Sequence, residues 1–140
     1  MSKLVIHLEQ GPIGWHDFSS LSAVPDQKER ALRSFGGLAI GSVPLRALLY
    51  SATARYVTFR SDDGYSTALS WASLDDCFVA YRLGALPLPR KLGGPFRAII
   101  VGASRHSCLK YVDAIELGEQ PRPDLRPSCA HAAPVDHWSE

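Results

Sequence analysis

Short apolar runs, each closed by turn residues, recur along this chain of 140 residues. Side chains alternate between apolar and polar in Lys3–Glu9, Arg55–Arg60 and Leu109–Leu117. A period of two buries one face of a β-strand. Cys77–Tyr81 and Phe96–Val101 are nearly continuous apolar runs, which are typical of buried strands. The pattern therefore predicts a domain built mainly from short strands.

Two helices are expected near the N-terminus. Asp17 has the side chain of a helix N-cap and precedes a short helical pattern over Phe18–Ala23. Asp26–Glu29 resembles a capping box, which predicts a second helix ending at Gly36-Gly37. An extended conformation of Arg30–Phe35 is the alternative.

A third helix is expected to begin at Gly41–Pro44, because proline favours the first helical position. Leu45, Leu48 and Leu49 would then form its apolar face. Asp62–Tyr65 has the composition of a tight turn. Many short strands with two or three short helices predict an α+β fold that is mixed and mainly β.

The chain length fits one domain with its own core. We expect residues 1–118 to form that domain. Residues 119–140 contain four prolines and no apolar periodicity, so we interpret them as a Pro-rich C-terminal tail.

The composition excludes several classes of protein. Net charge is +1 and charged residues make up 21% of the chain, which argues against a nucleic-acid or membrane-surface binder. Three widely spaced cysteines do not form a disulfide framework. The N-terminus lacks a secretory pattern, and no apolar run reaches membrane-spanning length. These features favour a cytoplasmic protein, and they leave its oligomeric state open.

Acidic residues are absent between Cys77 and Val112. Arginine and lysine occur throughout that window: Arg82, Arg90, Lys91, Arg97, Arg105 and Lys110. An even distribution of the 14 acids would place roughly three or four of them there. A strand that leads into a Gly- and Ser-containing basic loop suits a bound anion. A basic, solvated sheet edge is the alternative interpretation.

Other candidate chemistry is weaker. The histidines and cysteines of the C-terminal part match no common zinc-finger spacing: His106, Cys108, Cys129, His131 and His137. A metal-dependent function that uses these residues remains a third hypothesis. Asp62-Asp63 and Asp75-Asp76 are acidic pairs, but turn chemistry explains them without general acid–base catalysis. The catalytic residues, if any, stay unknown, and the sequence assigns no metal ligands.

Several segments together, in order, resemble the molybdopterin-binding domain of the sulfite-oxidase-like oxidoreductases. Ser42–Leu49 is similar to that family's "GVPLRDLL" helix, and Tyr56–Ser61 with Asp63–Tyr65 to its strand and DGY turn. Gly93–Arg97 and Ser107–Leu117 are similar to its "GGPLR" and "SVKWLRRIEL" segments. The resemblance covers about residues 40–117 and implies the fold of that domain.

The resemblance also implies a cofactor site. In that family the arginine of "GGPLR" and the serine and lysine of "SVK" lie at or near the pterin, whose phosphate the loop helps to hold. The corresponding residues are Arg97, Ser107 and Lys110, with Arg105 and His106 as helpers in the same loop. The implied ligand is molybdopterin or another small anionic molecule.

One element of the family pattern is missing. The cysteine that ligates molybdenum there precedes the "GVPL" helix, and the matching region Gln27–Ile40 contains no cysteine. The sequence thus leaves two functions open. One is a divergent molybdenum-cofactor-dependent oxidoreductase with a phosphate-binding loop, and the other is a non-catalytic binding or interaction module without molybdenum.

Overall fold

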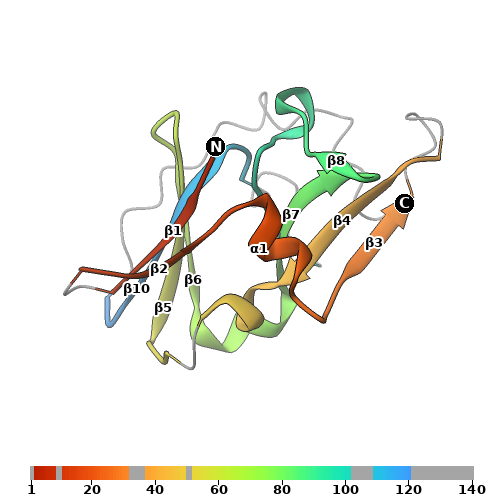
Figure 1. Cartoon of the computed structure of the whole chain (residues 1–140). Helices are drawn as coiled ribbons and strands as arrows, with labels where there is room; N and C mark the ends of the chain where they lie inside the picture. Colours follow the sequence, from red (N-terminus) through yellow and green to blue (C-terminus); the bar gives the residue numbers. More distant parts are fainter. Residues whose placement is uncertain (1, 9–10, 32–36, 50–51, 102–108, 121–140) are drawn as a thin grey trace.

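The computed structural model describes residues 2–8, 11–31, 37–49, 52–101 and 109–120. Its described strands form two five-stranded sheets that lie on either side of one core (Figure 1). Sheet A has the order β2-β1-β10-β5-β6, and sheet B has the order β3-β4-β7-β8, with β9 also paired to β7. The mixed, mainly β class predicted from sequence is therefore confirmed.

Strands of sheet A are β1 (Leu4–Leu8), β2 (Gly11–His16), β5 (Tyr56–Ser61), β6 (Ser66–Ser70) and β10 (Val112–Gly118). Strands of sheet B are β3 (Lys28–Ala31), β4 (Ala39–Pro44), β7 (Cys77–Leu83), β8 (Leu86–Pro87) and β9 (Arg97–Ile100). The helical segments are α1 (Phe18–Ser22) and the 3-10 helices η2 (Leu45–Leu48), η3 (Trp71–Asp76) and η4 (Arg90–Leu92).

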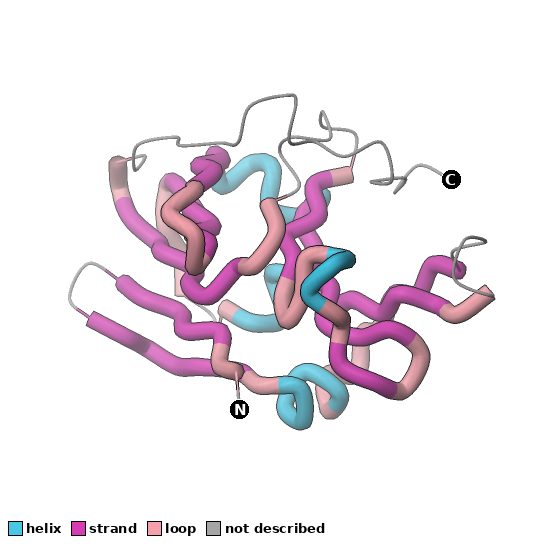
Figure 2. Tube along the Cα trace, turned by 90° about the horizontal axis from the view of Figure 1, so that it is seen from above, coloured by secondary structure: helices cyan, strands magenta, loops and turns pink. Residues whose placement is uncertain are grey.

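The main core lies between the sheets. Sheet A contributes Ile6, Phe59 and Ile115, whereas sheet B contributes Val79 and Tyr81, all of them fully or almost fully buried. Helical segments lie between and beside the two groups of strands (Figure 2). In the described part of the chain, no helix has the length and apolarity needed to cross a bilayer.

The N-terminal segment follows the sequence prediction in part. The expected strand is β1, and α1 carries the predicted Asp17 cap, with Ser20 completing a capping box. Gly11–His16 forms β2, which pairs antiparallel with β1. Backbone pairing with β1 thus outweighs the weak strand propensity of glycine and proline at this sheet edge.

The second predicted helix was wrong where the structure describes it. Lys28–Ala31 forms strand β3, which pairs antiparallel with β4, so the extended alternative is correct for Arg30 and Ala31; residues 32–36 lie outside the described residues. The third helix begins later than expected, as η2, because Gly41–Pro44 belongs to β4. Pairing within sheet B overrides these local helix signals.

The outer face of sheet B points away from the main core. Side chains alternate along β7 and β9, so Val79 and Ala98 enter the main core while Ala80 and Ile99 belong to a second apolar cluster. We define the outer face of sheet B as the face that carries Ala80 and Ile99.

Candidate binding site

The acid-free window folds around the edge of sheet B. It runs through β7, β8, η4 and β9, and its last described residues, 109–111, lead into β10. Ala98 N–H donates to the Leu109 carbonyl at 2.9 Å, and Val112 N–H donates to the Phe96 carbonyl at 2.8 Å. These bonds hold the residues on either side of positions 102–108 next to one another.

Arg97 and Lys110, two of the predicted site residues, meet at Gly93. A Cβ atom on Gly93 would lie 2.8 Å from Lys110 Cγ and 3.0 Å from Arg97 Cδ. Gly93 also has a φ of 96°, in the left-handed region where glycine is favoured, and its carbonyl accepts from Tyr111 N–H at 2.9 Å. Because Gly93 has no Cβ atom, the side chains of Arg97 and Lys110 can both pass close to its Cα.

Arg97 is almost completely buried, with 3% of its surface exposed. Its register partner on β7 is Ala80, which puts the arginine on the outer face of sheet B. Its Nη1 donates to the Leu92 carbonyl at 3.1 Å. A planar guanidinium with fixed N–H groups matches the geometry of a phosphate, and the partly buried Lys110 adds a second positive charge nearby.

Two other cations of the window form ion pairs. Arg90 forms a two-pronged contact with Asp62, with both N–O distances 3.1 Å, and its guanidinium lies 4.2 Å from the centre of the Tyr111 ring. Hydrogen bonding to Asp62 raises the pKa of Arg90 above its ordinary value. The acid-free stretch of sequence is thus partly neutralised by an acid from the β5–β6 turn.

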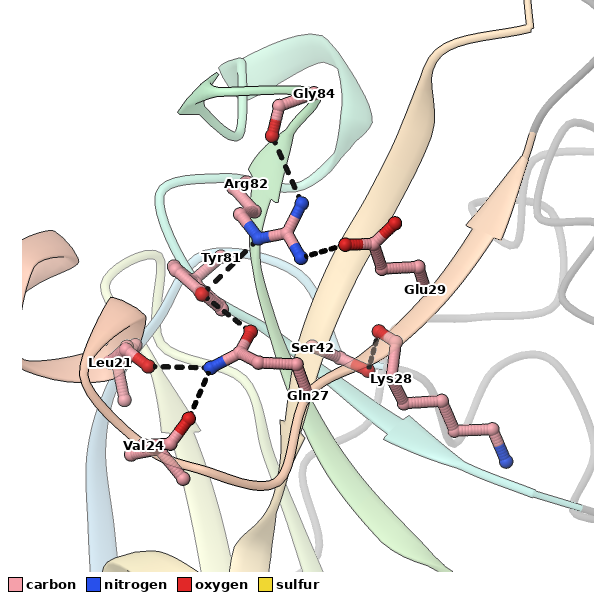
Figure 3. Close-up of polar contacts among 9 residues, drawn as sticks. All are labelled: Leu21, Val24, Gln27, Lys28, Glu29, Ser42, Tyr81, Arg82 and Gly84. Carbon is pink, nitrogen blue, oxygen red and sulfur yellow. Dashed lines mark hydrogen bonds and ion pairs between the residues drawn. The ribbon is translucent and has the colours of Figure 1, made fainter.

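Arg82 lies on the inner face of sheet B, opposite to Arg97, in a cluster of hydrogen-bonded polar groups (Figure 3). Its guanidinium donates to Glu29, to the Gly84 carbonyl at 3.0 Å and to the Tyr81 hydroxyl at 3.2 Å. Burial acts to lower the pKa of Arg82, but its hydrogen bonds with Glu29 and Tyr81 outweigh that effect and raise it. A Cβ on Gly41 would lie 2.3 Å from Arg82 Cζ, so this glycine makes room for the guanidinium.

Gln27 completes the cluster around Tyr81. Its Nε2 donates to the carbonyls of Leu21 and Val24, both at 2.9 Å, and its Oε1 accepts from the Tyr81 hydroxyl at 2.7 Å. The cluster ties the segment after α1 to β7 (Figure 3). Arg82 therefore has a structural role, apart from the site at Gly93.

The remaining predicted site residues, Ser107, Arg105 and His106, lie outside the described residues. The same holds for Cys108 and for the histidines and cysteine of the tail. Asp63 accepts from Ser61 within the β5–β6 turn, whereas Asp75, in η3, pairs with Arg46 at 2.7 Å.

Described residues offer no site for a metal ion. No group of three or more His, Cys, Asp or Glu side chains within the described ranges has the arrangement of a metal site. Cys77 is buried in the main core, on the opposite face of sheet B from Arg97, and its Sγ donates to the Ser73 carbonyl at 3.3 Å. Among the described residues, Arg97 and Lys110 supply the positive charge that suits a phosphate group.

Residues 27–125 match the oxidoreductase molybdopterin-binding domain family. The chain belongs to that family. The match extends the resemblance seen in the sequence at both ends, adds β3, and spans the site at Gly93. No curated protein matches the chain.

A solved structure supports the same fold. The sulfane dehydrogenase SoxCD from Paracoccus pantotrophus is similar to this chain with a TM-score of 0.67 at 16% sequence identity. The alignment covers 86% of this chain and 39% of the SoxCD chain. This member of the family thus spans well under half the length of that dehydrogenase chain.

Proposed function

We propose that this domain binds a phosphorylated pterin of the molybdopterin class, with the phosphate between Arg97 and Lys110. The observation that carries the proposal is that the side chains of both residues pass close to Gly93, where a Cβ atom would collide with them. Ser107, Arg105 and His106 are proposed as further ligands from the adjoining loop. Membership of the molybdopterin-binding family supports the choice of ligand.

Each residue has a distinct part in binding. Arg97 is buried and held by its bond to the Leu92 carbonyl, so its guanidinium orients the phosphate. Lys110 adds a compact charge that tolerates small shifts of the ligand. A bound molybdenum cofactor would supply two-electron redox chemistry, and the residues named here would hold and orient its phosphate end.

A non-catalytic binding module on the same fold is the second candidate function. The absence of cysteine from Gln27–Ile40 and the burial of Cys77 in the main core favour it. Under this proposal the protein is a pseudoenzyme that holds the pterin without molybdenum. In both cases we expect a cytoplasmic protein whose partner is a small molecule rather than nucleic acid or membrane.

The test is to purify the full chain from a molybdenum-replete host that makes the cofactor. Acid oxidation followed by fluorescence measures the pterin, and elemental analysis measures molybdenum. We expect pterin in the wild type and at least about tenfold less in Arg97→Gln and Lys110→Gln, because each loses a charge-assisted contact. Lys91→Gln, from an exposed lysine of the same window, is the matched control.

Each outcome selects one function. Pterin together with stoichiometric molybdenum supports an oxidoreductase, whereas pterin without molybdenum supports the non-catalytic binder. Wild-type protein free of pterin refutes cofactor binding. Equal pterin in the wild type and in both site variants would show that the phosphate lies elsewhere.

A further inference from the structure

A second basic position lies on the outer face of sheet B. Strand pairing aligns Lys28 with Ser42, Ser42 with Ala80, and Ala80 with Arg97. Arg30 lies two residues beyond Lys28 on β3, so alternation places it on the same outer face. Figure 3 agrees, because Glu29 points toward Arg82 whereas Lys28 points away from it.

Arg30 differs from Arg82 on the inner face, whose guanidinium donates hydrogen bonds to three acceptors. The Arg30 side chain is half-buried, and its Nε is shielded from solvent without a hydrogen-bond acceptor among the described residues. A guanidinium N–H that loses water without gaining an acceptor is unfavourable. A ligand that places a hydrogen-bond acceptor next to Arg30 Nε would therefore remove this unfavourable state and bind more tightly.

The charge around Arg30 also favours an anion. The nearest acid along the strand, Glu29, is engaged by Arg82 on the inner face. Lys28 lies on the outer face with its Nζ 4.7 Å from the centre of the Phe78 ring. Neither Lys28 nor Arg30 forms an ion pair with another described residue.

Arg30 and Arg97 are separated by three strand spacings on this face. Neighbouring strands lie about 4.8 Å apart, so the three strand spacings and the two-residue offset put the Cα atoms of Arg97 and Arg30 about 16 Å apart. A ligand that lies along the outer face of sheet B and is longer than one phosphate suits this separation of the two arginines. It needs an anionic or acceptor group at each end.

We propose that Arg30 binds the end of the ligand opposite the phosphate, through an anionic or strongly hydrogen-bond-accepting group. The choice of a phosphorylated pterin as that ligand rests on the proposed function, whereas the anion-binding role of Arg30 rests on its own surroundings.

The first experiment observes Arg30 directly, using sulfate as a tetrahedral dianion. The Nε–H resonance of Arg30 in the full chain is assigned by its loss in Arg30→Lys and is then followed by NMR during a sulfate titration. We expect a saturable shift that chloride at equal ionic strength does not produce, and that persists in Arg97→Gln. The Nε–H resonances of the exposed Arg55 and of the engaged Arg82 should not saturate.

The second experiment measures pterin retained by Arg30→Gln, with Arg55→Gln as the matched surface control. We expect about tenfold less pterin in Arg30→Gln, with a urea midpoint close to that of the wild type.

If sulfate gives no saturable shift at Arg30, or if Arg30→Gln keeps wild-type pterin, the proposal for Arg30 is overturned while the phosphate site stands. If Arg30→Gln unfolds far more readily than the wild type, the guanidinium is a structural group, and the proposal is equally overturned. Wild-type protein without pterin instead refutes the proposed function, and the sulfate titration then decides the role of Arg30.

Discussion

Replacing Tyr81 with phenylalanine tests the polar cluster that joins α1, β3 and β7. Tyr81 is 1% exposed, and its ring contacts Phe18 edge-on with the ring centres 5.6 Å apart. The substitution keeps that ring and removes only the hydroxyl. It therefore separates the hydrogen bonds of the cluster from its apolar packing.

The size of the effect follows from the two bonds of the hydroxyl. It donates to Gln27 Oε1 at 2.7 Å and accepts from Arg82 Nε at 3.2 Å. A neutral hydrogen bond contributes about 1 kcal/mol and one to a charged group about 1.5–3 kcal/mol. Arg82 keeps Glu29 and the Gly84 carbonyl as acceptors, so we expect the free energy of unfolding to fall by about 2 kcal/mol.

Urea denaturation of the wild type, Tyr81→Phe, Gln27→Ala and the double variant measures this loss and the coupling between the two residues. We expect a coupling energy of about 1 kcal/mol, because the two side chains share one bond. Tyr65→Phe is the control: no hydrogen bond joins the Tyr65 hydroxyl to a described residue, so the change should stay within about 0.5 kcal/mol. A loss below about 0.5 kcal/mol for Tyr81→Phe, or strictly additive effects, would refute the reasoning.

Two further substitutions test other parts of the structure. Gly94→Ala would place Cβ 1.8 Å from the Leu88 carbonyl oxygen, so urea denaturation should show a loss of about 3 kcal/mol or more; Gly64→Ala, where φ is 95° and the space is open, should cost only about 1 kcal/mol. Partial desolvation of the exposed Asp113, followed by the charge of Asp62, raises the pKa of this carboxyl above 3.8, so the native state binds this proton more tightly than the unfolded chain does. Its contribution to stability is present at acid pH and is lost as pH rises through the native pKa; Asp113→Asn should therefore raise the thermal midpoint at pH 7, and the gain should disappear below pH 3.8.

Much of the fold could be predicted from local pattern. The alternation in Lys3–Glu9 and Arg55–Arg60 locates β1 and β5, because a strand with one buried face needs that period. The Asp17 cap and the buried leucines of η2 were recognisable for the same reason, since capping and helical faces depend on neighbours in sequence.

The candidate site was only partly predictable. Arg97 and Lys110 came from the resemblance, but nothing local showed that Gly93 brings them together. Arg30 was missed because Asp26–Glu29 suggested a helix; as a strand, the same residues put Lys28 and Arg30 on one face. The acid-free window overstated the free positive charge, since Asp62 reaches Arg90 across 28 residues of sequence.

The sequence by itself determined the short strands, the turns, the family pattern and the absence of a cysteine from Gln27–Ile40, because these depend on residue type and near neighbours. Tertiary structure alone decided which cations form ion pairs and which lie on the outer face of sheet B. That division depends on strand pairing: β3 beside β4 sends Glu29 to Arg82 on the inner face and leaves Arg30 on the outer face. Pairing across sequence sets these environments, and local propensity carries no information about them.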